Sequence, residues 1–172
     1  MDTTNIICKH NSPYPEIICE NKNKEYAHIL QINYAGIISE LTSINQYLYH
    51  SFTVYKNSKE LSEILESIAN VEITHLKLLG NMIIELGGDP LFCINKGSKQ
   101  LNWTPKFIEY GSSLGCKLRE DIDGEKATIR QYENTIKLIK DENITAVIKR
   151  IIKDEEVHVK LLTSLLNKYC RR

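Results

Sequence analysis

The sequence has no long apolar run, no excess of charge of either sign and no paired cysteine motif. No stretch approaches the roughly 20 apolar residues that a membrane-spanning helix requires, and the start, Met1-Asp-Thr-Thr-Asn5, does not have the features of a signal peptide. Lys and Arg together number 22, as do Asp and Glu. This balance gives no support for binding to nucleic acid or to an anionic membrane. We therefore expect a cytoplasmic protein.

Cysteines are few and scattered, and no Cys-x-x-Cys occurs. Their odd number and wide spacing argue against a disulfide framework, a zinc ribbon and a rubredoxin-type iron centre. We expect free thiols at all five positions, which are Cys8, Cys19, Cys93, Cys116 and Cys170. No segment shows the alternation of polar and apolar residues that indicates a strand. The length of 172 residues, with 42% hydrophobic and 26% charged residues, is typical of one globular domain.

What the sequence does contain is one pattern that occurs twice. Each copy begins with a lone glutamate that has Ile at +4, Gln at +6 and Tyr at +7, and a Glu-x-x-His follows about 30 residues later. The lone glutamates are Glu40 and Glu125, the paired glutamates are Glu72 and Glu155, the histidines are His75 and His158, and the tyrosines are Tyr47 and Tyr132. Four helices that project four Glu and two His into one bundle core make a di-iron or di-manganese carboxylate site.

A third Glu-x-x-His, at Glu25 and His28, lacks this context. It has no counterpart in the second half of the chain. It also lies 15 residues before Glu40, which is about 22 Å along a helix. We expect these two residues to take no part in the site.

The remaining pattern predicts an all-α fold of four helices. After an irregular N-terminal arm at 1–22, residues 23–172 are expected to form one bundle domain, with helices over about 24–54, 57–87, 112–140 and 143–170. The connection 88–111 is long enough for the second and third helices to run parallel, with a helical turn expected after Pro105. Polar breaks near Lys56 and Lys140 lie midway between the glutamates of each half. Two helical hairpins would thus bring these glutamates to one level.

The proposed ligands interrupt apolar stripes rather than polar faces. In the first helix the inward stripe is the least regular, because it includes a polar residue; its members are Ile29, Asn33, Ile37, Glu40, Ile44 and Tyr47. Burying four carboxylates without a partner costs several kcal/mol for each charge. Two divalent ions would supply the opposite charge. The alternative is a buried hydrogen-bond network without metal.

On these motifs, residues 24–170 resemble the ferritin-like superfamily of di-iron carboxylate proteins, most nearly the rubrerythrin and bacterioferritin group. The resemblance implies a four-helix bundle with a long crossover between helices 2 and 3, and two iron or manganese ions held by the six Glu and His residues. It implies that the paired glutamates bridge the ions. Tyr47 and Tyr132 would hydrogen-bond ligand carboxylates, with the alternative that they are ordinary core aromatics. Asp154, just before Glu155, would hydrogen-bond His75.

Departures from the family pattern narrow the expectation. Ile73 stands where bacterioferritin has a haem-ligating Met, so we expect no haem. Thr128 replaces an additional Glu of rubrerythrin. The cysteine pattern excludes a rubredoxin domain, so a peroxidase would need an external electron donor. Val71 stands where a second Asp would pair with His158, so the two ions are expected to be inequivalent.

Our first functional expectation is a rubrerythrin-like oxidoreductase that reacts with hydrogen peroxide or dioxygen. A manganese catalase-like enzyme uses nearly the same ligands, and spacing does not separate iron from manganese. The pattern is also compatible with an iron-oxidising storage protein of bacterioferritin type and with a metal-stabilised structural bundle. The resemblance further leads us to expect a homo-oligomer.

Overall fold

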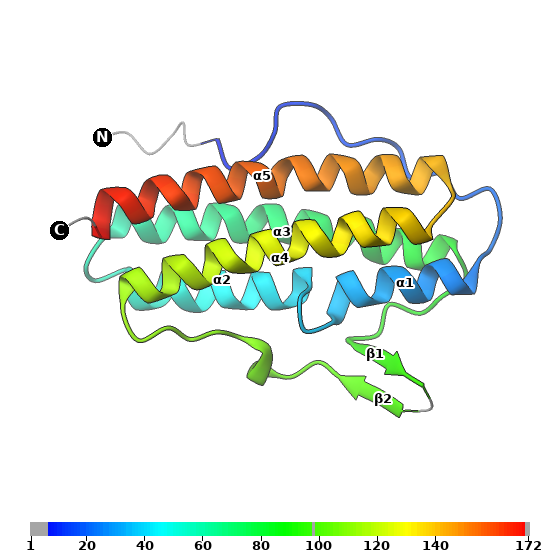
Figure 1. The fold of residues 1–172 in the computed structure, drawn as a ribbon, viewed down its shortest axis with the longest axis horizontal. Helices are drawn as coiled ribbons and strands as arrows, with labels where there is room; N and C mark the ends of the chain where they lie inside the picture. The colour runs from blue at the N-terminus through cyan, green and yellow to red at the C-terminus, as the bar shows by residue number, and fades with distance from the viewer. Residues whose placement is uncertain (1–6, 98, 171–172) are drawn as a thin grey trace.

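In the computed structural model, which describes residues 7–97 and 99–170, the chain folds into a bundle of long helices with one small hairpin at its side (Figure 1). The elements are α1 (Lys24–Ala35), α2 (Glu40–Val54), α3 (Lys59–Glu85), β1 (Cys93–Lys96), β2 (Lys99–Asn102), the 3-10 helix η2 (Pro105–Phe107), α4 (Leu114–Leu138) and α5 (Glu142–Cys170). Helices α1 and α2 follow one another along the bundle, and α3 and α4 run in the same direction (Figure 1). The predicted four-helix bundle with a long crossover between the second and third helices is confirmed, as is the helical turn after Pro105.

The predicted single helix over 24–54 is wrong at residues 36–39, where the chain leaves the helix. A side chain on Gly36 would place its Cβ 2.5 Å from the carbonyl oxygen of Ile32. Ser39 then caps α2, accepting a hydrogen bond from the Thr42 N–H at 3.3 Å and donating to the Gly36 carbonyl at 2.8 Å. The break turns Ile37 outward. This residue is 57% exposed, which contradicts its predicted place in the inward stripe.

The break sets the position of Glu40, which becomes the first residue of α2. A carboxylate in the first turn of a helix lies near the positive end of the helix dipole. The break is also tied to the opposite half of the bundle, since the Gln131 amide donates to the Ile38 carbonyl at 2.7 Å and to the Asn33 side chain at 3.0 Å. Asn33, the polar member of the stripe, is thus buried with partners.

The Gln at +6 of the other copy has an equivalent task. Gln46 donates to Asp121 at 2.9 Å and accepts from the backbone N–H of Glu109, also at 2.9 Å. His50 joins Asp121 to the carbonyl of Glu109 on the same face, with both contacts at 2.9 Å. The repeated glutamines therefore hold the two irregular connections, one at the helix break and one at the crossover, against the helices that carry the lone glutamates.

The hairpin of β1 and β2 was not expected from the sequence. Its strands are four residues each and pair antiparallel, with Gly97 at positive φ in the turn. The hairpin packs near α1, where the Phe92 ring lies 5.6 Å from the Tyr34 ring and the Gln31 amide donates to the Leu91 carbonyl. Such short strands without an alternating pattern give no strand signal in the sequence.

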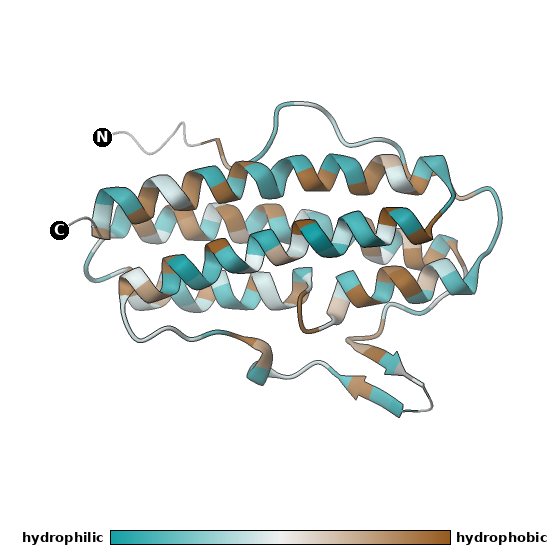
Figure 2. Cartoon of the chain, viewed as in Figure 1, coloured by the Kyte–Doolittle hydropathy of each residue, from teal (hydrophilic) through white to brown (hydrophobic). Residues whose placement is uncertain are grey.

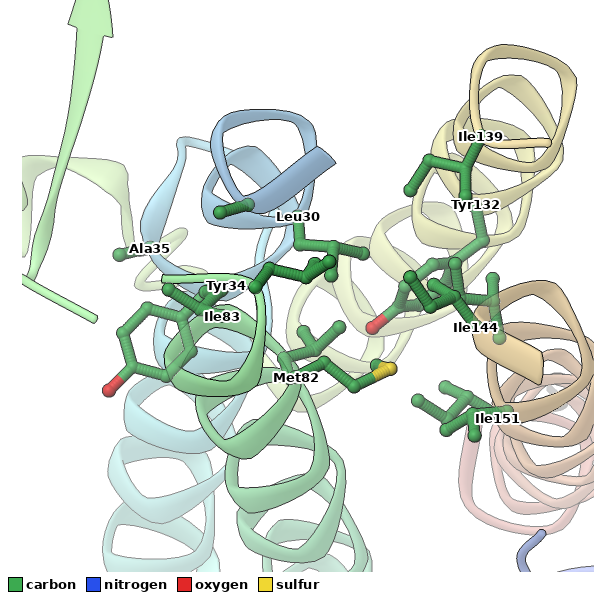
Figure 3. Close-up of a cluster of buried hydrophobic side chains, with 14 of the residues drawn as sticks. Leu30, Tyr34, Ala35, Met82, Ile83, Tyr132, Ile139, Ile144 and Ile151 are labelled. Carbon is green, nitrogen blue, oxygen red and sulfur yellow. The ribbon is translucent and has the colours of Figure 1, made fainter. Parts of the chain in front are cut away.

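The core consists of two apolar clusters with a polar layer between them. One cluster contains Leu30, Met82, Tyr132, Ile144 and Ile151, which converge from α1, α3, α4 and α5 (Figure 3). The other lies toward the opposite end of the bundle and includes Leu61, Ile68, Leu118, Ile122 and Leu162. Hydrophilic and hydrophobic residues are interspersed in bands along α4 and α5 (Figure 2), as in helices with one apolar face. Among the described residues, no helix has both the length and the apolar character that a membrane crossing requires.

We predict that the cap at the helix break contributes measurably to stability. Ser39→Ala removes the hydroxyl that serves the N-terminus of α2, and should lower the free energy of unfolding of the metal-free protein by about 1 kcal/mol. Ser67→Ala is the matched control, because this exposed serine lies inside α3 and bonds only to the carbonyl of its own helix. Urea denaturation followed by circular dichroism measures both. Equal effects of the two substitutions would contradict the role of Ser39 as a cap.

Candidate metal centre

The polar layer consists of the six residues singled out by the repeat. Each is at most 3% exposed. They come from four helices, with one lone glutamate each from α2 and α4, and one Glu-x-x-His each from α3 and α5. Their ligand atoms form two groups that share the paired glutamates: Glu40, Glu72, His75 and Glu155 in one, and Glu72, Glu125, Glu155 and His158 in the other. Within each group the atoms lie within 4.8 Å of one another.

Each histidine points one ring nitrogen at three carboxylates. The Nδ1 atom of His75 lies 2.9 Å from Glu72, 3.2 Å from Glu155 and 3.6 Å from Glu40. The Nδ1 atom of His158 lies 2.9 Å from Glu72, 3.0 Å from Glu155 and 3.3 Å from Glu125. Each paired glutamate turns one oxygen toward His75 and the other toward His158. This is the arrangement that two bridging carboxylates would need.

The donor set fits a pair of cations. Each Nδ1 atom carries at most one hydrogen, so it cannot donate good hydrogen bonds to three carboxylates at once. Accordingly, one oxygen on each of Glu40, Glu72 and Glu155 is buried without a well-formed hydrogen bond to any described residue. Such atoms are costly unless a charge compensates them. Carboxylate oxygen and imidazole nitrogen are ligands that both iron and manganese accept.

The two tyrosines of the repeat reach across the bundle. The Tyr132 hydroxyl, from α4, donates to Glu40 on α2, and the Tyr47 hydroxyl, from α2, donates to Glu125 on α4. Each tyrosine therefore holds the lone glutamate of the other half. Burial raises the pKa of both hydroxyls well above the usual range, and the nearby carboxylates raise it further. Both tyrosines remain hydrogen-bond donors as a result.

The charges of the layer shift the pKa values of its own members. Burial raises the pKa of both lone glutamates well above the usual range, and the charges of the paired glutamates raise it further. Burial alone would lower the pKa of His75 and His158, but the surrounding carboxylates outweigh it and raise both. For Glu72, burial alone would raise the pKa, but the charges of His158 and His75 outweigh burial and lower it. Protons and metal ions thus compete for the same atoms.

The histidines differ in what lies behind them. Asp154 accepts from the Nε2 side of His75 at 3.1 Å, as expected from the sequence. The Nε2 atom of His158 is buried and has no hydrogen-bond partner among the described residues. The sequence reasoning missed three further residues at Asp154, namely His10, Tyr14 and Arg150. Arg150 could have been found, because it lies four residues before Asp154 on the inward face of α5.

The third Glu-x-x-His lies elsewhere. Glu25 and His28 are exposed on α1, and neither belongs to the two groups of ligand atoms. Ile73, at the position of the haem-ligating Met, is partly buried on α3.

A cavity of about 350 Å³ opens between α2 and α4 and reaches the polar layer at one point. Its wall includes Tyr47 and Glu125, which are otherwise almost fully buried. Thr128 and Gly124 form part of the α4 side, and Phe107 of the crossover also lines the cavity. A small molecule in this cavity would meet Glu125 first among the six residues.

Comparison with known families matches residues 35–171 to the family described as Ferritin-like domain. This match covers most of the chain, including the whole polar layer. The chain belongs to this family.

Two kinds of relative are similar over most of their length. A probable manganese catalase from Clostridium acetobutylicum is 23% identical over 173 residues, with 89% of this chain and 75% of the relative covered. A bacterioferritin from Desulfovibrio desulfuricans is 27% identical over 143 residues, covering 81% and 74%. Among solved structures, a manganese catalase from Anabaena superposes with a TM-score of 0.83 at 23% identity, covering 95% of this chain and 80% of that one. The Desulfovibrio bacterioferritin gives 0.69 at 24% identity, covering 83% and 78%.

We predict that stabilisation by metal grows with pH. The lone glutamates and the histidines have raised pKa values in the folded state, so their contribution to stability is present at low pH and is lost as pH rises through those values. Metal ions take the place of these protons, and the stabilisation that the ions give does not weaken when the protons are lost at higher pH. The gain in melting temperature on adding Mn²⁺ should therefore be larger at about pH 8 than at about pH 5.5.

Differential scanning fluorimetry of metal-free protein, with and without Mn²⁺, measures this gain. His28→Ala serves as a control and should show the wild-type trend, since His28 is exposed outside the layer. A gain that is constant or shrinks with pH would contradict the competition between protons and metal.

Proposed function

We propose that the protein is a dinuclear-metal oxidoreductase whose substrate is hydrogen peroxide. Glu40 and His75 would hold one ion and Glu125 and His158 the other, with Glu72 and Glu155 shared between them. The observation that carries this proposal is the sharing itself. Each paired glutamate places one oxygen near Nδ1 of His75 and the other near Nδ1 of His158, at distances of 2.9 to 3.2 Å.

When bound, a pair of iron or manganese ions would supply the electrons and the Lewis acidity for peroxide chemistry. The residues of the chain provide the setting. The two apolar clusters exclude bulk water from both sides of the layer, which strengthens electrostatic interactions inside it. Tyr47 and Tyr132 fix the orientation of the lone glutamates. The cavity between α2 and α4 gives a molecule of the size of peroxide a path to Glu125.

Among peroxide reactions, the relatives support disproportionation, in which two molecules of peroxide give two of water and one of dioxygen. Residues 1–22 make up more than a tenth of the chain. The superposition on the manganese catalase covers 95% of this chain and must therefore include part of the N-terminal arm. The superposition on the bacterioferritin covers 83% of this chain, a share that the bundle alone can account for. This reaction needs no external electron donor, unlike the rubrerythrin-like peroxidase that the sequence led us to favour.

Iron oxidation is the second candidate, supported by the similarity to a bacterioferritin whose structure contains a di-iron site. Its substrates would be Fe²⁺ and dioxygen. The acidic residues Glu109, Glu120, Asp121 and Asp123 around the same cavity are compatible with a cationic substrate.

The decisive experiment loads metal-free protein with Mn²⁺ or with Fe²⁺ and follows peroxide loss, dioxygen release and Fe²⁺ oxidation separately. We expect peroxide loss with dioxygen release and without added reductant. His158→Ala should lower the rate by more than about 10-fold, because it removes a ligand. His28→Ala, with the same local Glu-x-x-His spacing, should retain wild-type rates. Fe²⁺ oxidation by dioxygen without peroxide turnover would instead establish the second candidate.

Substrate access gives a further prediction at Gly124. A Cβ built there meets no atom within 4 Å, so a side chain at this position would extend into open space. Gly124→Leu should fill part of the cavity and lower kcat/KM for peroxide at unchanged metal content. Gly124→Ala should keep kcat/KM near wild type and raise stability by about 0.5–1 kcal/mol as a better helix former. Equal kcat/KM in the two variants would show that peroxide reaches the layer by another path.

A further inference from the structure

Asp154 is surrounded by hydrogen-bond donors, and two of them come from the N-terminal arm. Its Oδ1 atom lies 2.6 Å from the backbone nitrogen of His10 and 2.7 Å from Nη1 of Arg150. Its Oδ2 atom accepts from the Tyr14 hydroxyl at 2.7 Å and contacts Nε2 of His75 at 3.1 Å. The side chain is completely buried. Oδ1 is thus held by the His10 N–H and by the ion pair with Arg150, and Oδ2 by the Tyr14 hydroxyl and by His75.

The arm is fixed at this point by the same arginine. Arg150, which is 5% exposed, donates through Nε to the carbonyl of Ser12 at 2.7 Å and through Nη2 to the carbonyl of His10 at 2.8 Å. Its guanidinium also lies 4.3 Å from the centre of the Tyr14 ring. That ring forms a T-shaped pair with the His75 ring, with centroids 6.2 Å apart and an interplanar angle of 79°. Residues 10–14 therefore contact both Asp154 and the histidine that Asp154 supports.

The other half of the bundle has no such arrangement. The position equivalent to Asp154 is Val71 on α3, and the Nε2 atom of His158 has no hydrogen-bond partner in the described part of the chain. Beside Val71, a cavity of about 410 Å³ separates α3 from the arm at Cys8 and Tyr14. The arm thus supports one histidine of an otherwise repeated site.

We propose that residues His10–Tyr14 are a positioning element of the metal centre: by fixing Asp154 behind His75, they make the His75 position bind its ion more tightly than the His158 position. This inference rests on the proposed metal centre. A carboxylate behind a ligand histidine fixes the ring and raises its basicity, and loss of such a partner typically costs 10- to 100-fold in metal affinity. Metal should consequently bind in two steps, with His75 occupied first.

The test is a titration of metal-free protein with Co²⁺, followed by its visible absorption and by calorimetry. Wild type should show two resolved steps. Tyr14→Phe keeps the ring against Arg150 and His75 but removes one donor to Asp154, and should weaken the first step by roughly 10-fold with the second unchanged. Tyr169→Phe is the matched control. It removes a tyrosine hydroxyl that donates to the Glu60 carboxylate at 2.8 Å. Because this pair lies away from the metal centre, the variant should titrate like wild type.

The ratio of the two affinities separates positioning from general stability, because a loosened fold would weaken both steps together. Val71→Asp supplies the converse, since it places a carboxylate behind His158 and should tighten the second step. If Tyr14→Phe weakens both steps equally or neither, or if folded Val71→Asp leaves the second step unchanged, the role of the arm is overturned while the centre stands. A wild-type protein that binds no metal would overturn the centre and this role together.

Discussion

The interaction on which this structure depends is the repulsion among four glutamates held at one level inside the bundle. The two imidazoles alone leave several oxygens of these glutamates without hydrogen bonds to the described residues. Burial also raises the pKa of the lone glutamates well above the usual range. A core of this kind is stable only when positive charge enters it, either as protons or as metal ions. The layer would therefore link folding, pH and metal content.

The surrounding structure keeps this layer in register. Two apolar clusters close it from both ends of the bundle. The tyrosines cross from one half to the lone glutamate of the other, so that each half orients a residue of its counterpart. The glutamines at +6 hold the helix break and the crossover, which are the two irregular segments nearest the lone glutamates. The repeat thus extends beyond the ligands to the residues that position them.

The sequence was sufficient for the features that repeat. The four-helix bundle and the level of the six residues follow from helical periodicity and from spacing about the two turns, whereas the contact of Asp154 with His75 was expected from the family resemblance. It was insufficient where a local contact overrides periodicity. The helix broke at 36–39 because Gly36 closes against the preceding turn and Ser39 caps the next helix. The arm gave no signal, because it holds Asp154 and Arg150 through backbone groups that any sequence provides and through Tyr14, which belongs to no repeated or periodic pattern.

Two metal ions are expected to share the paired glutamates. Crystals grown with Mn²⁺ and measured at the manganese absorption edge test it directly, because anomalous differences locate each ion independently of any assumed ligand. We expect two peaks about 3.5–4 Å apart, one beside His75 and one beside His158, with Glu72 and Glu155 touching both. A single peak, or two peaks that share neither glutamate, would contradict this expectation.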